Sequence, residues 1–155
     1  MEATFHSLIL MRSSLKKQIV LCLLVLGAYI SAPAAEMRVE KYHAGDWEND
    51  IGYCQAVRVG QLLYISGTTG AGKMPEAIRG AYDNLAKTLK AHGLTFKDVV
   101  KENIYTTDID ALKANNSIRL AFYDKSFPAA TWVQVQRLYL PDQIIEIELT
   151  AVFPQ

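Results

Sequence analysis

The sequence predicts an α+β domain in which two helices cover one face of a mixed β-sheet. Strand-like segments, in which apolar and polar residues alternate, occur before, between and after two segments whose apolar residues recur at helical spacing. The predicted order is therefore β-β-β-α-β-α-β-β. Half of the 155 residues are apolar, and the roughly 120 residues that follow an N-terminal leader suffice for one hydrophobic core.

The leader is identified by its charge and hydropathy. Three basic residues precede an apolar run of 12 residues, 19–30, after which small residues stand at Ala32 and Ala34. The run is short for a bilayer span, and the pattern is typical of a secretory signal peptide. We therefore expect residues 1–35 to be cleaved and residues 36–155 to form an exported domain, periplasmic or secreted. The alternative is an uncleaved N-terminal anchor.

The composition of residues 36–155 bears on partners. They contain 13 basic and 15 acidic residues, a formal charge of −2. This balance gives no support for binding nucleic acid, or for binding a membrane once the signal peptide is removed. The one remaining cysteine, Cys54, has no partner for an internal disulfide, and we interpret it as a small buried residue. No spacing of His, Cys or Asp resembles a metal site, so no metal ligand is predicted.

The first predicted elements are strands. Residues 37–42 favour a strand, and the polar stretch 43–52, which contains two glycines, favours a loop. Residues 55–59 and 62–66 alternate as the two arms of a hairpin. Gly60-Gln61 suits the two-residue turn between them, because glycine readily adopts a positive φ.

The stretch "GTTGAGKM", residues 67–74, nearly matches a phosphate-binding loop. That motif needs a hydroxyl for Mg²⁺ at its last position, where this chain has Met74. Pro75 also removes a backbone N–H near the start of the following helix. We therefore interpret the stretch as a flexible connection and not as a nucleotide site.

The first helix is predicted over residues 75–92. Pro75 suits its first turn, and Gly93 suits the left-handed residue that ends a helix. Five apolar residues share one face at helical spacing: Ile78, Ala81, Tyr82, Leu85 and Leu89.

A strand over residues 98–108 and a second helix within residues 108–127 follow. We expect Asp110 to cap this helix. Its inward residues are predicted to be Leu112, Ile118 and Phe122. One face of the strand carries Val99, Lys101, Asn103 and Tyr105, and the other Val100, Glu102, Ile104 and Thr106.

Two strands, 132–136 and 144–152, complete the sheet. Glu146 and Glu148 share one face of the last strand, because side chains alternate with a period of two. A carboxylate there can orient a water or act as a general base, and the alternative is a solvated strand face. Four apolar residues are expected to exceed what two helices can bury, which predicts oligomerisation: Tyr64, Trp132, Ile145 and Ile147.

Uncharged hydrogen-bonding side chains stand near the ends of several predicted elements. Together they can supply the few converging polar groups of a small-molecule site in an apolar cleft. They are Tyr53, Ser66, Asn116 and Thr131.

Four segments resemble the RidA family, also called YjgF or endoribonuclease L-PSP: residues 52–67, 81–112, 127–135 and 144–152. The resemblance implies a chorismate-mutase-like two-layer α+β sandwich that forms a homotrimer with a ligand cleft at each subunit boundary. It also implies hydrolysis of 2-imino or enamine acids to 2-oxo acids and ammonia, without metal or cofactor.

The resemblance places Tyr53, the Ser66-Gly67 pair and Asn116 in the pocket, and makes Glu146 the catalytic acid that positions water. Two further positions, Thr131 and Trp132, follow from the segment "FPAATWVQV", in which Trp132 is expected to narrow the cleft.

The segment departs from the family pattern at Ala130. The family motif Pro-Ala-Arg-Ser/Thr reads Pro128-Ala129-Ala130-Thr131 here, so Ala130 replaces the arginine that holds the substrate carboxylate. Losing such a charge-assisted hydrogen bond costs about 1.5–3 kcal/mol. We expect Arg58 and Arg137 to form ordinary surface or inter-strand ion pairs. The alternative is that a neighbouring subunit presents one of them to the pocket in place of the missing arginine.

The sequence thus predicts an exported RidA-like protein whose inter-subunit pocket takes a small ligand without efficient 2-imino acid deamination. The alternative is a metal-free imine or enamine deaminase that uses Glu146 and water. A nuclease finds no support, because phosphate contacts need a basic face.

Overall fold

The computed structural model describes residues 38–154. The expected signal peptide, residues 1–35, lies outside them. The strands are β1 (Val39–Tyr42), β2 (Ala56–Val59), β3 (Leu62–Ala71), β4 (Val99–Thr106), β5 (Ala129–Gln134) and β6 (Gln143–Val152). The helices are α2 (Trp47–Ile51), α3 (Met74–Ala91), α4 (Ile109–Ala114) and α5 (Asn116–Tyr123), with a 3₁₀ turn at Phe96–Asp98.

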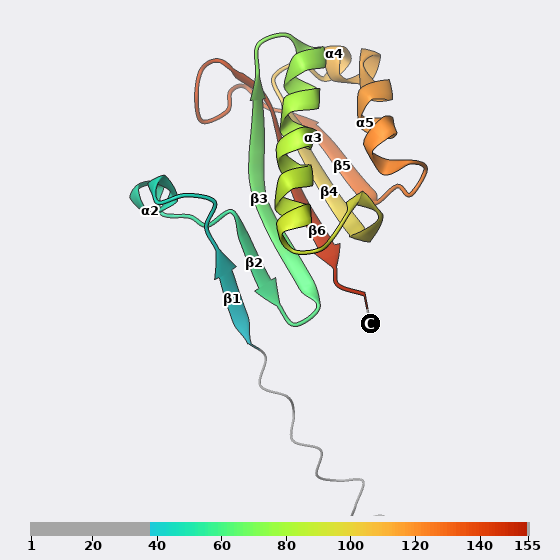
Figure 1. The fold of residues 1–155 in the computed structure, drawn as a ribbon. Helices are drawn as coiled ribbons and strands as arrows, with labels where there is room; N and C mark the ends of the chain where they lie inside the picture. Colours follow the sequence, from blue (N-terminus) through green and yellow to red (C-terminus); the bar gives the residue numbers. More distant parts are fainter. Residues whose placement is uncertain (1–37, 155) are drawn as a thin grey trace, which may run out of the picture. The chain divides into compact units, whose positions relative to one another are not determined.

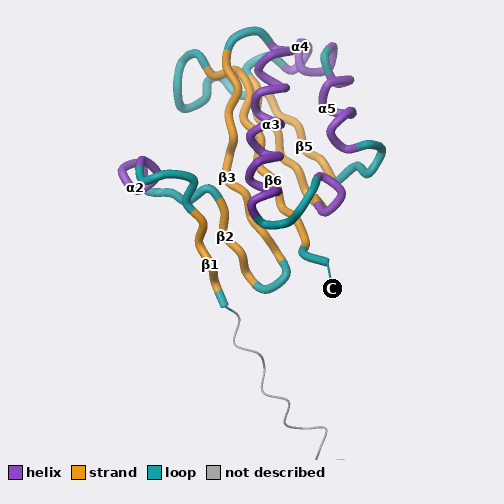
Figure 2. The backbone as a smooth tube through the Cα atoms, viewed as in Figure 1, coloured by secondary structure: helices purple, strands orange, loops and turns teal. Residues whose placement is uncertain are grey.

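The six strands form one mixed sheet in the order β1-β2-β3-β6-β4-β5. All neighbours are antiparallel except β4 and β5, which run parallel. Figures 1 and 2 show α3 and α5 on the same side of this sheet, so one face is covered by helices. The predicted α+β fold, with helices on one face of a mixed sheet, is confirmed.

The core lies between α3 and the central strands. Ile78 and Leu85 of α3 and Leu63 of β3 are fully buried there. Ile145 and Ile147 are also fully buried, which corrects their expected place on an uncovered face. The alternation of β6 turns both isoleucines toward the helices and turns Glu146 and Glu148 toward the open face, and the prediction that the two glutamates share one face is confirmed.

Trp132 belongs to the covered face as well. It is half-buried and packs against the core, because β5 pairs with β4 so that Trp132 lies beside the fully buried Ile104. Of the four residues expected on the uncovered face, Tyr64 alone is exposed there, at 47%. The open face is therefore less apolar than the sequence analysis predicted.

Strand β3 is longer than predicted. Residues 67–71, expected to belong to a flexible connection, continue the strand because β6 pairs with them as far as Ala71. Gly70 permits this packing, since a Cβ there would overlap the carbonyl of Ala77 in α3. Helix α3 itself spans Met74–Ala91, within one residue of the prediction at each end.

A bulge near the start of β4 reverses two predicted positions. The register shifts between Val99 and Lys101, so Val99 is buried and Val100 is 46% exposed. From Lys101 onward the predicted faces hold, with Glu102 and Ile104 fully buried.

The second helical segment is two helices, α4 and α5, separated at Asn115. Its cap is Asp108, whose carboxylate accepts a hydrogen bond from the Ala111 backbone at 2.8 Å, and not the predicted Asp110. Leu112 is fully buried, and the other two predicted inward residues, Ile118 and Phe122, pack against the core.

A buried polar network holds the helices on β4. The Glu102 carboxylate accepts hydrogen bonds from the hydroxyls of Tyr82 on α3 and Tyr123 on α5, both at 2.6 Å. It also pairs with the Arg119 guanidinium, at 2.7 Å from Nε and 2.6 Å from Nη2. Every group of this network is thus satisfied, as burial of charge requires.

Candidate functional site

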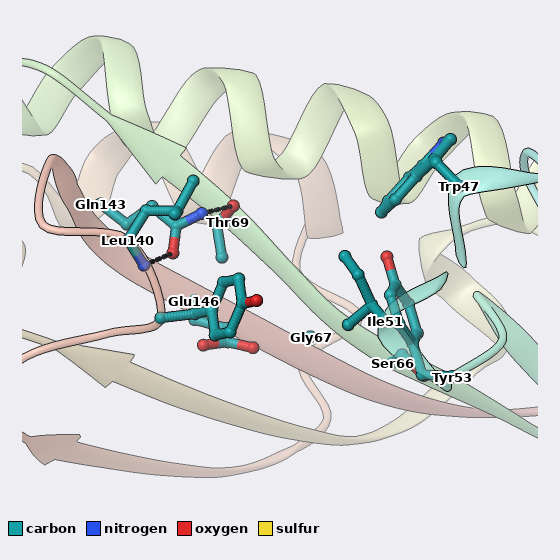
Figure 3. A pocket seen from close by; sticks show the side chains of 10 residues that line it. Trp47, Ile51, Tyr53, Ser66, Gly67, Thr69, Leu140, Gln143 and Glu146 are labelled. Carbon is teal, nitrogen blue, oxygen red and sulfur yellow. Dashed lines mark hydrogen bonds between the residues drawn. The ribbon is translucent and has the colours of Figure 1, made fainter. Parts of the chain in front are cut away.

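A cavity of about 440 Å³ opens between α2, β3, β6 and the loop of residues 135–142. We call it the Glu146 cavity. Figure 3 shows Tyr53 and Ile51 on one side of it and Glu146, Leu140 and Gln143 on the other. Its lining residues are Trp47, Ile51, Tyr53, Ser66, Gly67, Thr69, Tyr139, Leu140, Gln143 and Glu146.

Glu146 stands near the middle of the sheet. In register it lies between Thr69 of β3 and Tyr105 of β4, and its side chain is on the open face. Gly67 makes room for it, because a Cβ at that position would overlap the Glu146 carboxylate. Gly67, predicted to lie in a loop, thus belongs to β3, and a larger residue there would displace the Glu146 side chain.

The two glutamates of β6 have different environments. Glu148 accepts hydrogen bonds from Asn103 Nδ2 at 2.6 Å and from the Tyr105 hydroxyl at 3.0 Å. Glu146 has no hydrogen-bond partner among the described residues. Burial, together with the nearby charge of Glu148, raises the pKa of Glu146 above its usual value. A carboxyl group of this kind is suited to exchange a proton with a bound water or substrate.

Tyr53 and Ser66 line the cavity opposite Glu146. Burial, and the charges of Glu48 and Glu146, raise the pKa of Tyr53, so its phenol keeps its proton at neutral pH. The Ser66 hydroxyl donates to the carbonyl of Cys54 at 2.7 Å, which ties β3 to the segment before β2. Its oxygen can still accept a hydrogen bond from a ligand.

Six lining residues were not predicted from the sequence, and one of them is Thr69 of β3. Trp47 and Ile51 come from α2, a short helix inside the stretch predicted to be a loop. Tyr139, Leu140 and Gln143 come from the end of the 135–142 loop and the start of β6. The sequence carried a signal for four of these residues. Trp47, Ile51, Tyr139 and Leu140 are large apolar residues in otherwise polar connecting segments, where the hydrophobic core does not require them.

Glu48 holds α2 in place. Its side chain is fully buried and accepts hydrogen bonds from the backbone of Gln55 at 2.9 Å and of Ala44 at 3.1 Å. His43 Nδ1 lies 3.3 Å from the same carboxylate. These contacts set the position of the segment that carries Trp47 and Tyr53.

The structure divides the predicted site residues into two sets. Tyr53, Ser66, Gly67 and Glu146 line the Glu146 cavity. The other four, Asn116, Ala130, Thr131 and Trp132, do not line it.

This second set lies on α5 and β5. Thr131 Oγ1 accepts from Lys101 Nζ at 2.6 Å on the open face, and Ala130 lies beside Glu102 in the sheet register. The Arg119 guanidinium lies 5.2 Å from the Trp132 ring. Within one chain, the two sets do not form a common pocket.

The two arginines considered as substitutes are engaged elsewhere. Arg58 stacks on Phe153 at 3.9 Å and donates to the Gly60 carbonyl. Arg137 donates to the carbonyls of Leu138 and Tyr139, both at 3.3 Å. Neither side chain lines the Glu146 cavity.

Two further properties concern residues 38–154 alone. No group of three or more His, Cys, Asp or Glu side chains is placed to hold a metal ion in this part of the chain. No helix among these residues is long and apolar enough to cross a membrane.

Comparison with known sequences gives consistent matches. Residues 48–153 match the family described as endoribonuclease L-PSP. A human protein named 2-iminobutanoate/2-iminopropanoate deaminase is 34% identical over 109 residues, which cover 64% of this chain and 79% of that protein. A RutC family protein from Pyrococcus horikoshii is 32% identical over 108 residues, or 64% of this chain and 85% of its own length.

Solved structures agree with these matches. A member of the YjgF/YER057c/UK114 family from Mycobacterium tuberculosis is 31% identical, with a TM-score of 0.69 over 75% of this chain and 100% of its own. A putative endoribonuclease from Thermotoga maritima is 29% identical, with a TM-score of 0.64 over 77% of this chain and 99% of its own.

Proposed function

Because the chain belongs to the endoribonuclease L-PSP family, also called RidA or YjgF, we propose that it hydrolyses imines or enamines to carbonyl compounds and ammonia. Its residues act without metal or cofactor in this proposal. The observation that carries it is Glu146, a partly buried carboxyl group with a raised pKa and no hydrogen-bond partner among the described residues, on the wall of a cavity. The human relative named as a deaminase supports the same chemistry.

The proposed reaction is an addition followed by an elimination. Water attacks the carbon of the C=N bond while the Glu146 carboxylate accepts one of its protons. The protonated Glu146 then returns that proton to the nitrogen. The hydroxyl group passes its proton to the departing nitrogen as the C=O bond forms, the C–N bond breaks, and ammonia leaves. Tyr53, whose phenol stays protonated, donates a hydrogen bond to the reacting molecule.

We also propose that the protein works as a homotrimer. The open sheet face exposes Tyr64 and Val133, at 47% and 40%, and none of the helices in residues 38–154 covers them. Within one chain Ala130 and Thr131 do not line the Glu146 cavity. A second copy placed against the open face can bring its own Ala130 and Thr131 toward that cavity, which completes an inter-subunit cleft.

Export to the periplasm or the exterior belongs to this proposal too. It rests on the signal-peptide pattern of residues 1–35.

A second candidate function is ligand binding without efficient turnover. Two observations favour it: the lining of the Glu146 cavity contains no Arg, Lys or His, and Ala130 occupies the position of the carboxylate-binding arginine. In that case the cavity binds a small molecule, and the protein lacks the arginine that would hold a substrate carboxylate.

The two candidates are separated by the rate of imine hydrolysis. Imines are generated in situ from amino acids and from amines by the corresponding flavin oxidases, with catalase present, and loss of imine is followed by trapping with semicarbazide. We expect acceleration over buffer, which Glu146→Gln reduces by roughly 10²–10⁴-fold because the general base is lost.

The matched control is Glu76→Gln, the same change at an exposed position in the first turn of α3. It should leave the rate unchanged. If the wild-type protein accelerates hydrolysis of none of the imines but Ala130→Arg does, the ligand-binding candidate is favoured. The missing arginine then explains the lack of turnover.

A further inference from the structure

The Glu146 cavity has a lining of one charge only. Glu146 is the only charged side chain among its ten lining residues. Trp47, Tyr53 and Tyr139 add three aromatic rings, and Ile51 and Leu140 add aliphatic surface. A carboxylate bound there would be repelled by Glu146 and would meet no counter-charge among these ten residues, whereas a cation would find both an anion and aromatic faces.

Two cationic side chains on neighbouring segments of the same chain donate hydrogen bonds to other acceptors and do not line the Glu146 cavity. Arg137 donates to backbone carbonyls of its own loop. Lys87 donates to Asn84 on α3 and lines a neighbouring hollow, which shares Trp47, Tyr53, Gly67 and Thr69 with the Glu146 cavity but not Glu146 itself.

Within one chain, Lys101 is on the open face but distant from the cavity. It donates to Thr131 and stands four residues along β4 from Tyr105, the register partner of Glu146. Four residues of strand correspond to about 13 Å.

We propose that the substrate of this cavity is an iminium cation that has no carboxylate and carries an aromatic or branched apolar group. The C=NH₂⁺ group pairs with the Glu146 carboxylate, while the apolar group packs between Trp47, Tyr53 and Tyr139. Charge-assisted hydrogen bonds to a carboxylate and contacts of a cation with aromatic faces are both stronger when partly removed from water. This inference rests on the proposed hydrolysis and names its substrate class.

The reaction is balanced without any further reactant. The iminium ion and one water give an aldehyde or ketone and one ammonium ion. Water forms the new C–O bond and loses a proton to Glu146, the amine nitrogen takes that proton, and the C–N bond breaks. The departing ammonia takes the hydroxyl proton and leaves as ammonium. The reaction that supplies such a substrate is the two-electron oxidation of an amine, not of an amino acid.

Two substrates that differ only in the carboxylate test the inference. They are the imines made in situ from 2-phenylethylamine and from phenylalanine by flavin oxidases. We expect kcat/KM for the amine-derived imine to be at least tenfold higher. The opposite preference overturns the inference and leaves the proposed hydrolysis standing. If neither imine is hydrolysed faster than in buffer, the proposed hydrolysis fails and the inference fails with it.

Calorimetry with stable ligands gives a second readout that needs no turnover. We expect trimethyl(2-phenylethyl)ammonium to bind at least tenfold more tightly than 3-phenylpropanoate, and Glu146→Gln and Tyr139→Leu each to weaken the cation at least fivefold. Glu76→Gln, the same loss of charge at an exposed position of α3 outside the cavity, should leave its binding unchanged. Equal binding of cation and anion, or loss of binding in Glu76→Gln alone, overturns the inference.

Discussion

At the scale of single residues, the proposed hydrolysis depends on two glutamates of β6 in different environments. Asn103 and Tyr105 hold Glu148 as a fixed acceptor, while Glu146 faces the cavity without a partner among the described residues. Burial and the charge of Glu148 both raise the pKa of Glu146. One strand therefore supplies a positioned charge and, beside it, a carboxyl group that gives and takes protons more readily near neutral pH.

This arrangement predicts a pH dependence of kcat/KM. A general base works when it is ionised, so activity should rise with pH through the raised pKa of Glu146 and then level off. The groups that face Glu146 are Glu148, Tyr53 and Tyr105. Glu148→Gln removes one negative charge, which lowers the pKa of Glu146 and should move the rising limb to lower pH.

Pre-steady-state pH profiles of wild type and Glu148→Gln measure this shift. Burial is the larger cause, so the midpoint in Glu148→Gln should remain above the ordinary value of 4.5. A midpoint that does not move would show that Glu148 has no electrostatic effect on the base.

At the scale of elements, the cavity depends on α2, a helix of five residues. A helix this short is not stable by itself. It is held by the buried Glu48 carboxylate, which accepts two backbone hydrogen bonds and lies next to His43. Trp47 and Ile51, on either side of Glu48, are placed at the cavity as a consequence.

Glu48→Ala should therefore affect both stability and substrate binding. It leaves the N–H groups of Ala44 and Gln55 without acceptors, which costs about 1–3 kcal/mol and lowers Tm by about 4–8 °C for each kcal/mol. We expect KM to rise more than kcat falls, because Trp47 and Ile51 lose their positions while Glu146 on β6 does not.

The control is Asp50→Ala, an exposed carboxylate on the same helix, which should change neither quantity. Thermal unfolding and steady-state kinetics measure both effects. A lower Tm with unchanged KM would show that Glu48 stabilises the fold without positioning the cavity wall.

At the scale of the whole molecule, the sheet has one covered and one open face. The helices bury Ile145 and Ile147, so the open face carries polar residues with a few exposed apolar ones. The two sets of predicted site residues lie apart in one chain. A single protomer therefore presents one part of the expected cleft beside the surface that a second copy would cover.

The open face of the sheet predicts assembly into a trimer. We expect light scattering to give three times the mass of the protomer, and Val133→Asp on the open face of β5 to give a folded monomer with little turnover. A charge there would be desolvated in the interface. Leu120→Asp, at a 39% exposed position on α5 in the helical layer, should remain trimeric. A monomeric wild type that hydrolyses imines would show that one chain suffices.

Much of the local structure of this protein could be predicted from its sequence. Period-two alternation placed Glu146 and Glu148 on one face of β6, and helical spacing with flanking Pro75 and Gly93 placed α3 within one residue at each end. These patterns are local, because backbone geometry alone decides which neighbouring side chains share a face. The segments that resemble the RidA family were likewise sufficient to predict the fold.

The tertiary structure decided what local patterns cannot contain. Residues 67–71 are strand because β6, more than 70 positions later, pairs with them, and the same pairing brings Glu146 against Gly67. Helix α2 exists because Glu48 bonds to backbone outside it. Which face the helices cover, and which distant side chains share a cavity, depend on long-range pairing, and the free energy of that pairing belongs to no single segment.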